Sequence, residues 1–344
     1  MVLLIRDQDI REVEISAEEI IEAVEDAYHQ EGMGVAEYTP RIEIKIKGKE
    51  LPHIAPGTTS VGQGMAYLKG SKAFVISHSY HFSRHKYVSH ILDPEDGETL
   101  AIVVRGRELS GSKRGELNTG SLRTGAAAAI GAKYLARKEV NSVGVLGTGR
   151  IGRASLVCLS KVRDFDKAYV HSGKRRNDEF AHDMGFTLGV DVIAADDAMR
   201  VVRESDILIT ATYATEPIVR GKWLKEGVHI SGMGADGPLK CELDLDTISR
   251  MDKIVIDSEK CLSIGEISNA IESGVLRADG IHGKISEVVA GAKSGRENPN
   301  EITLFESDGT HIQSASVVWL IYEKIKQAGL GIETSDLSSF FLYP

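Results

Sequence analysis

The sequence has few of the features that mark a membrane, secreted or nucleic-acid-binding protein. No apolar run approaches the roughly 20 residues that span a bilayer, and the amino terminus lacks the basic region, apolar stretch and cleavage site of a signal peptide. The net charge of -9 leaves no excess of cations to displace counterions from a nucleic acid. We therefore expect a cytoplasmic protein with no membrane and no nucleic-acid partner.

Cysteine is also scarce. Cys158, Cys241 and Cys261 are odd in number and widely spaced, which fits neither a disulfide framework nor a zinc knuckle. Three histidines lie close together between residues 78 and 85, but no neighbouring cysteine or paired carboxylate completes a metal-ligand set. We expect buried, reduced thiols and no bound metal.

Two kinds of hydrophobic pattern divide the 344 residues. A capping-box pattern, Ser16 with Glu19, precedes a helical repeat, and residues 41–104 then alternate in the manner of a mostly antiparallel sheet. Between residues 142 and 257, short apolar segments alternate with helical ones, which is typical of a parallel α/β sheet. A last amphipathic helix is expected over residues 314–326.

A glycine-rich turn follows the apolar segment 142–146. Its sequence, Gly147-Thr-Gly-Arg-Ile-Gly152, matches G-x-G-x-x-G and lies between a predicted strand and a helix predicted over residues 150–159. This context lets free N–H groups and the helix dipole point at a pyrophosphate. We therefore predict that a dinucleotide contacts the whole turn, which consists of Gly147, Thr148, Gly149, Arg150, Ile151 and Gly152.

This motif identifies the α/β part as a Rossmann-type domain, which we assign to residues 121–313. Residues 1–120 and 314–344 then form an α+β domain. Since the carboxyl ends of the parallel strands face the cofactor, we expect further contacts from the segments that end or begin there. These residues are Thr124, Thr212, Tyr213, Met233 and Gly234.

The end of the strand after the glycine turn bears on which dinucleotide binds. An acid that holds the ribose 2′-hydroxyl is usual about 20 residues past the glycines. This chain has Tyr169-Val-His-Ser-Gly-Lys-Arg-Arg176 instead, which offers a hydroxyl and cations. Because guanidinium pairs strongly with phosphate, we predict NADP(H) as the preferred cofactor and NAD(H) as a possible one, with contacts from His171, Ser172, Lys174 and Arg175. The alternative is that these cations begin a solvated helix.

Several stretches, taken in order, resemble the ornithine cyclodeaminase/mu-crystallin family, which includes archaeal-type alanine dehydrogenases and cyclic imino acid reductases. The resemblance covers nearly the full length. The matching stretches are Thr39-Pro-Arg41, Leu68-Lys69, Ile91-Leu-Asp-Pro-Glu-Asp-Gly97, Leu122-Arg-Thr-Gly-Ala126, Lys133-Tyr-Leu-Ala136, the glycine turn, Met233-Gly-Ala-Asp-Gly-Pro-Leu-Lys-Cys-Glu-Leu243, Ser294-Gly-Arg296, Glu301-Ile-Thr-Leu-Phe305 and Asp308-Gly309.

The resemblance implies that Arg41, Lys69 and Arg123 hold the substrate carboxylate. Bidentate pairing of guanidinium with carboxylate suits two arginines to this work. Lys72 lies three residues after Lys69 and is an alternative to it. Each of these residues can also be read as an exposed cation with no site role. Independently, the position of His85 and Lys86 before the strand that precedes the Asp93-Pro94 turn suggests that His85 or Lys86 lines the substrate pocket.

The resemblance also implies that Asp236 is catalytic. It follows the predicted strand 229–231, at the sheet edge that faces the cofactor, where a carboxylate can take a proton from the substrate amine or from an attacking water. Lys69 is the second residue that we assign to the chemistry. The alternative for Asp236 is a turn-forming aspartate before Pro238.

Two departures from the family pattern concern the substrate. Ser314 follows Gln313 where family members usually carry an aspartate. Residues 107–118 form a longer and more polar loop near the expected entrance of the site.

The resemblance implies hydride transfer between a nicotinamide and the α-carbon of a small amino or imino acid. We rank an amino acid dehydrogenase or imine reductase first, because a preference for NADP(H) suits net reduction. The alternatives are an ornithine cyclodeaminase-type lyase that recycles its NAD(P), and a protein that binds NADPH and a small ligand without catalysis. The resemblance further implies a homodimer formed through the substrate-binding domain of residues 1–120 and 314–344.

Overall fold

The chain forms two units with different kinds of sheet in a computed structural model. The mixed-sheet unit consists of Met1–Thr119 and Thr310–Pro344, and the parallel-sheet unit of Gly120–Gly309. The structure describes residues 1–45, 60–81, 85–106, 117–173 and 177–335. Within these ranges, no helix is long and apolar enough to cross a membrane.

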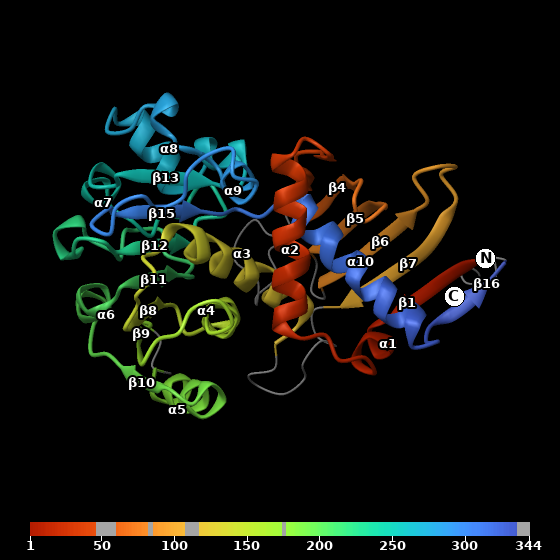
Figure 1. The fold of residues 1–344 in the computed structure, drawn as a ribbon, viewed down its shortest axis with the longest axis horizontal. Helices are drawn as coiled ribbons and strands as arrows, with labels where there is room; N and C mark the ends of the chain where they lie inside the picture. Colours follow the sequence, from red (N-terminus) through yellow and green to blue (C-terminus); the bar gives the residue numbers. More distant parts are fainter. Residues whose placement is uncertain (46–59, 82–84, 107–116, 174–176, 336–344) are drawn as a thin grey trace. The chain divides into compact units, whose positions relative to one another are not determined.

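An eight-stranded sheet lies at the centre of the parallel-sheet unit (Figure 1). All of its described pairings are parallel. The strand order is β10 (Asp191–Ala194), β9 (Lys167–His171), β8 (Ser142–Leu146), β11 (Ile207–Thr210), β12 (His229–Gly232), β15 (Thr303–Glu306), β13 (Lys253–Ile256) and β14 (Gly283–Lys284). The central strands β8, β11, β12 and β15 are buried along their whole length, as expected for a parallel sheet covered on both faces. The predicted Rossmann-type α/β class is confirmed.

Helices pack on both faces of this sheet. On one face α3 packs closely against β15. Gly131 of α3 lies against the ring of Phe305, and a Cβ at this position would have no room. On the other face, Ile230 and Leu304 share an apolar cluster with Ile267 of α8. The α-helices of the unit are α3 (Thr119–Leu135), α4 (Arg150–Leu159), α5 (Asn177–Leu188), α6 (Ala198–Glu204), α7 (Leu245–Ser249), α8 (Gly265–Glu272) and α9 (Ile285–Val289).

The sheet of the mixed-sheet unit is antiparallel except at β1, which pairs in parallel with β7. Long hairpins dominate it, and β4, β5, β6 and β7 follow one another in sequence and in space. The strand order is β16 (Ile332–Thr334), β1 (Val2–Arg6), β7 (Thr99–Gly106), β6 (His85–Leu92), β5 (Ala73–His81), β4 (Ser60–Leu68) and β2 (Ala36–Tyr38), with β3 (Ile42–Lys45) also paired to β4.

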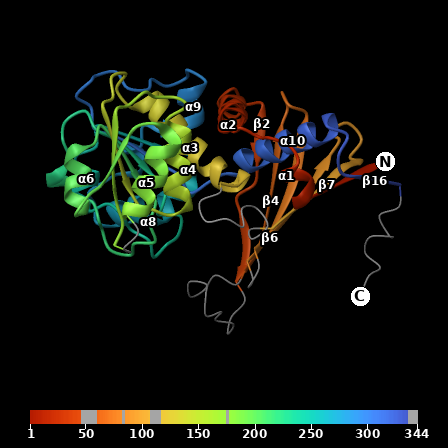
Figure 2. The same ribbon diagram turned by 90° about the horizontal axis from the view of Figure 1, so that it is seen from below.

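Two helices cover one face of this second sheet, α2 (Ala17–Gly32) and α10 (His311–Gln327), while α1 (Asp7–Arg11) is short (Figure 2). The predicted capping box begins α2, since the Ser16 hydroxyl accepts from the N–H of Glu19 and the Glu19 carboxylate accepts from the N–H of Ser16. Gln313 is fully buried and its amide donates to the hydroxyl of Tyr28, so it ties α10 to α2.

Candidate functional site

The glycine turn has the backbone geometry that close approach of a phosphate requires. Gly147 adopts a φ of +110°, and a Cβ there would lie 2.4 Å from the carbonyl oxygen of Ala211. A Cβ at Gly152 would lie 2.0 Å from the carbonyl oxygen of Gly147. By contrast, a Cβ at Gly149 would meet no atom within 4 Å. The first and third glycines therefore serve the protein's own packing, and the second leaves open space at the start of α4.

The amino terminus of α4 is accessible. Gly149 is its N-cap and no side chain caps the helix there, which is typical of a helix start that binds an anion. Gly149 and Arg150 are exposed, and Thr148 and Ile151 are half-buried. This end of α4 is exposed and has open space at Gly149, and so the residues present fit a dinucleotide.

The strand after the turn ends without a carboxylate. His171, the last residue of β9, donates through Nδ1 to the carbonyl of Ala195 at 3.0 Å, and Ser172 follows it half-buried. The carbonyl of His171 accepts from the N–H of Gly147 at 2.9 Å, which links this strand end to the glycine turn. Lys174 and Arg175 lie outside the described residues, as do residues 107–116 of the predicted loop 107–118.

The loops after β11 and β12 are joined by a buried acid that sequence patterns did not indicate. Glu242 is fully buried and accepts from the N–H of Thr212 at 2.7 Å, from its hydroxyl at 2.6 Å and from the N–H of Gly234 at 3.0 Å. Met233 is also buried, and its backbone N–H donates to the carbonyl of Thr210. Tyr213, by contrast, is 72% exposed. An acid between Cys241 and Leu243 looks like an ordinary surface residue, so no local signal could have found it.

Asp236 lies on the loop after β12 and is exposed to solvent. Its carboxylate forms an ion pair with Lys240, whose ammonium lies 4.5 Å from the centre of the Tyr213 ring. Tyr213, Lys240 and Asp236 therefore form a connected group at the carboxyl edge of β11 and β12. Lys240 is a second residue that sequence reasoning missed.

Arg123 is half-buried in α3 and lies against a glycine on a different segment. Its guanidinium donates to the Thr124 hydroxyl at 3.2 Å, and a Cβ at Gly309 would meet the guanidinium at 3.1 Å. Asp257 fixes that turn, since its carboxylate accepts from the N–H of Gly309 at 2.9 Å and from the hydroxyl of Ser307. Gly309 must lack a side chain for Arg123 to take this place.

Asp257 belongs to a buried acidic group. Asp257, Cys261 and Asp308 each bring one potential ligand atom within 4.8 Å of the others, although the sequence predicted no metal. Asp308 pairs with Lys260 and accepts from the Ser258 hydroxyl at 2.7 Å. Burial, and then the neighbouring Asp308 carboxylate, raise the pKa of Asp257 to about 6. The hydrogen bonds of these residues indicate that the acidic group stabilises the turn beside Arg123.

In the mixed-sheet unit, Arg41 lies over a gap in β4. Its guanidinium donates to the Ser79 hydroxyl at 3.1 Å, and both lie where a side chain at Gly62 would be. Gly64, two residues further along the same face, leaves room for the imidazole of His311. His311 is therefore a neighbour of Arg41 that the sequence did not reveal, because the two are far apart along the chain.

Lys69 does not lie beside Arg41. Lys69 and Lys72 are exposed in the turn between β4 and β5, and Ser79 lies six residues beyond Ala73, where β5 begins. At roughly 3.3 Å per residue, the turn is about 20 Å from Ser79, too far for both cations to hold one small carboxylate. Residue 85 begins β6, but the side chain of His85 lies outside the described residues.

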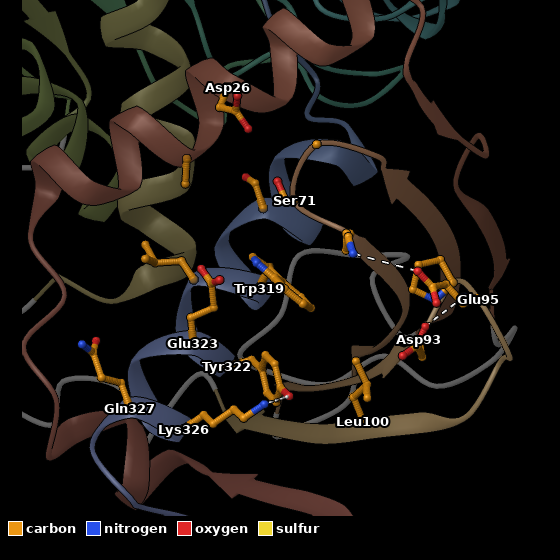
Figure 3. Close-up of a pocket in the computed structure, with 16 residues that line it drawn as sticks. Asp26, Ser71, Asp93, Glu95, Leu100, Trp319, Tyr322, Glu323, Lys326 and Gln327 are labelled. Carbon is orange, nitrogen blue, oxygen red and sulfur yellow. Dashed lines mark hydrogen bonds and ion pairs between the residues drawn. The ribbon is translucent and has the colours of Figure 1, made fainter.

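Lys72 instead lines a separate cavity of about 1190 Å³ at this end of the hairpin (Figure 3). The residue has a left-handed backbone, with a φ of +52°, and its ammonium lies 3.9 Å from Glu95. Trp319 and Tyr322 of α10 and Asp26 of α2 contribute to the walls. The two lysine candidates therefore lie at the opposite end of the hairpin from the Arg41 site.

Comparisons with known proteins agree over the full length. A sequence profile of the ornithine cyclodeaminase/mu-crystallin family matches residues 2–329. Alanine dehydrogenase of Archaeoglobus fulgidus is 31% identical over 341 residues, covering 96% of this chain and 98% of the relative.

Two solved structures are also similar. The Delta(1)-pyrroline-2-carboxylate reductase of Thermococcus litoralis, in complex with NADH and L-proline, has a TM-score of 0.84 and 32% identity, and the match covers 97% of this chain and 100% of that one. An archaeal alanine dehydrogenase dimer with bound NAD has a TM-score of 0.82 and 28% identity, covering 97% and 99%.

The same substitution should have different consequences at two glycines of the turn. Gly149→Ala should leave the thermal unfolding midpoint nearly unchanged, because its Cβ meets open space, but should weaken NADH binding by at least about tenfold by blocking the phosphate. Gly152→Ala should destabilise the protein by about 1–3 kcal/mol through overpacking. Calorimetry and NADH fluorescence titration check both, and unaltered NADH affinity in Gly149→Ala would contradict the assignment.

Proposed function

The chain belongs to the ornithine cyclodeaminase/mu-crystallin family, and from that membership we propose that it is a nicotinamide-dependent oxidoreductase acting at the α-carbon of a small amino or imino acid. The observation that carries the proposal is the carboxyl edge of the parallel sheet. There the glycine turn after β8, the Thr212 loop after β11 and the Asp236 loop after β12 follow adjacent strands. In doubly wound sheets this edge holds the dinucleotide.

The proposed chemistry gives each residue one task. Nicotinamide, when bound, exchanges a hydride with the substrate α-carbon. Asp236 takes the proton from the substrate amine or from an attacking water, and its pairing with Lys240 keeps the carboxylate oriented. Arg123, fixed over Gly309, pairs with the substrate carboxylate.

Arg41 is proposed as a ligand of the substrate carboxylate on the basis of the family resemblance, supported by its hydrogen bond to Ser79. Lys69 is left out of the proposed set because of its place in the hairpin turn. His85 stays a prediction from the sequence.

Replacing Asp236 tests the catalytic assignment. Asp236→Asn keeps the shape of the side chain but removes the proton acceptor, so turnover should fall by about 10²-fold or more while NADH binding is retained. The measurement is NADPH or NADH absorbance against a panel of oxo acids with ammonia or methylamine, and of cyclic imines. Asp196→Asn, an exposed aspartate on another loop, is the matched control. Wild-type rates in Asp236→Asn would refute the role.

The same panel separates the alternatives. Net consumption of the reduced cofactor identifies a dehydrogenase or imine reductase. Ammonia release from ornithine with no net change in absorbance identifies a cyclodeaminase, and binding of cofactor with no turnover identifies a ligand-binding protein.

We propose NADP(H) as the preferred cofactor within the broader NAD(P) class. The support is the end of β9, where His171 and Ser172 stand in place of an acid, and the cations Lys174 and Arg175 that follow in sequence. Two relatives of known structure were solved with NADH or NAD, so the proposal of NADP(H) is based on the residues of this chain and not on those relatives.

Cofactor preference is measured by titration. The wild-type protein should bind NADPH more tightly than NADH, because lysine and arginine pair with the 2′-phosphate. The double variant Lys174→Ala/Arg175→Ala should lose NADPH affinity and keep its NADH affinity, which serves as the internal control. Equal or tighter binding of NADH by the wild type would overturn the preference.

We also propose a homodimer formed through the mixed-sheet unit. Its sheet has one face beneath α2 and α10 and another on which Ile42, Ile44 and Val104 are 67%, 70% and 40% exposed. The strand register places Val61 opposite Ile44 and Val88 opposite Val104, so both valines lie on that same face, where they are half-buried. An apolar sheet face of this kind favours a second copy, and the archaeal alanine dehydrogenase of similar fold is a dimer.

Charge on this face should prevent association. Ile44→Lys/Val104→Lys should shift the protein from dimer to monomer in sedimentation equilibrium, because two desolvated ammonium groups per copy oppose burial. The control is Phe186→Lys, an apolar side chain 90% exposed in the other unit, which should leave the mass unchanged. A dimer that persists in the double variant would place the interface elsewhere.

A further inference from the structure

A single buried carboxylate connects two loops at the proposed active edge. Glu242 accepts three hydrogen bonds, two from Thr212 and one from the N–H of Gly234. Thr212 lies two residues past the end of β11 and Gly234 two residues past the end of β12. Each loop then continues to one member of the exposed group, Tyr213 and Asp236.

The contact between Glu242 and the second loop is close. A Cβ at Gly234 would lie 2.5 Å from the carboxyl carbon of Glu242. The carboxylate therefore lies directly against the backbone, and any shift of Glu242 moves the segment that leads to Asp236. This makes the position of Asp236 dependent on a residue that does not touch it.

Two further glutamates lie in the same interior. Glu266, the second residue of α8, is 1% exposed, and Glu306, the last residue of β15, is 3% exposed. Both carboxyl oxygens of Glu306 and one of Glu266 have no hydrogen-bond partner in the described part of the chain. The other oxygen of Glu266 accepts from the N–H of Glu242 at 3.4 Å. We call these three residues the glutamate triad.

The three glutamates of the triad differ in their surroundings and in how strongly burial raises their pKa. Burial, followed by the charge of Glu242, raises the pKa of Glu266 to about 8, and burial raises the pKa of Glu306 well above its usual range. Burial also raises the pKa of Glu242, but the donors of Thr212 and Gly234 oppose the shift there. An anion with three donors is stable in a buried site, whereas an anion with none is not.

We propose that Glu242 is a positioning residue for the reaction: as the ionised member of the glutamate triad it holds the loops of Tyr213 and Asp236 in place, while Glu266 and Glu306 are neutral acids. The assignment rests on the proposed function. A carboxylate suits this work because each of its two oxygens accepts hydrogen bonds, so it can serve both loops at once. An amide has one accepting oxygen and would turn a donor toward one of the loops.

The decisive comparison is between two glutamines. Glu242→Gln should lower kcat by about 100-fold with little change in KM, because one loop is released and Asp236 is misplaced. Glu266→Gln, an isostere of the neutral acid, should keep kcat near the wild-type value at pH 7. Glu242→Asp retains the charge on a shorter stem and should recover part of the loss. Equal losses in the two glutamine variants, or wild-type kcat in Glu242→Gln, would overturn the proposal.

A readout without turnover separates failure of this proposal from failure of the proposed function. Because Glu266 has a raised pKa, its contribution to stability is complete below about pH 4.5 and is lost as pH rises to about 8. Glu266→Gln should therefore remove part of the fall in unfolding free energy over that interval. Denaturant titrations from pH 5 to 8.5 measure this, even if no substrate is turned over.

Other ionisable groups facing the triad bear on the pH dependence. Asp257 and Asp308 act on Glu306, and Cys241 lies near Glu266 and Glu242. The Cys241 thiol, with its pKa raised to about 11 by burial and then by Glu266, stays neutral throughout the interval. Because Glu266→Gln retains these three groups, its difference from the wild type reports on Glu266. The same slope in Glu266→Gln and wild type would show that Glu266 is not the proton carrier.

Discussion

The alignment of parallel strand ends is the constraint on which the parallel-sheet unit depends. Parallel pairing places the carboxyl ends of β8, β11, β12 and β15 at one edge, so that loops distant in sequence become neighbours. Everything assigned to cofactor or chemistry in this unit lies at or near that edge. The close packing of Gly147 and Gly152 then decides where the backbone of the first loop runs.

Buried acids of two kinds support the sheet. Asp206 lies beneath the amino-terminal end, where it pairs with Arg137 and Lys225 and accepts from the N–H of Asn141. Burial raises the pKa of Asp206, but these cations and donors lower it by more. The pKa of Asp206 is therefore below its usual value. Glu266 and Glu306 have no such cation and no comparable set of donors among the described residues, and they keep their protons. The contrast shows that burial alone does not set the state of an acid, since the donors around it decide.

The mixed-sheet unit illustrates how missing side chains create a site. Gly62 and Gly64 leave two adjacent gaps on the face of β4 that α10 covers, and Arg41 and His311 occupy them. The opposite face carries apolar residues with no covering helix in the described part of the unit. One sheet thus presents a polar recess on one side and an association surface on the other, as period-two alternation allows.

The sequence by itself determined the strand–turn–helix of the dinucleotide motif, the parallel class of the sheet in the parallel-sheet unit and the capping box of α2. Each depends on periodicity or on residues a few positions apart, which local sterics and hydrogen bonds translate directly into structure. Tertiary structure alone decided that Glu242 joins two loops, that Gly309 lies under Arg123, and that the hairpin turn of Lys69 lies about 20 Å from Ser79. These contacts depend on which strand ends meet and on hairpin register, and no local pattern encodes them.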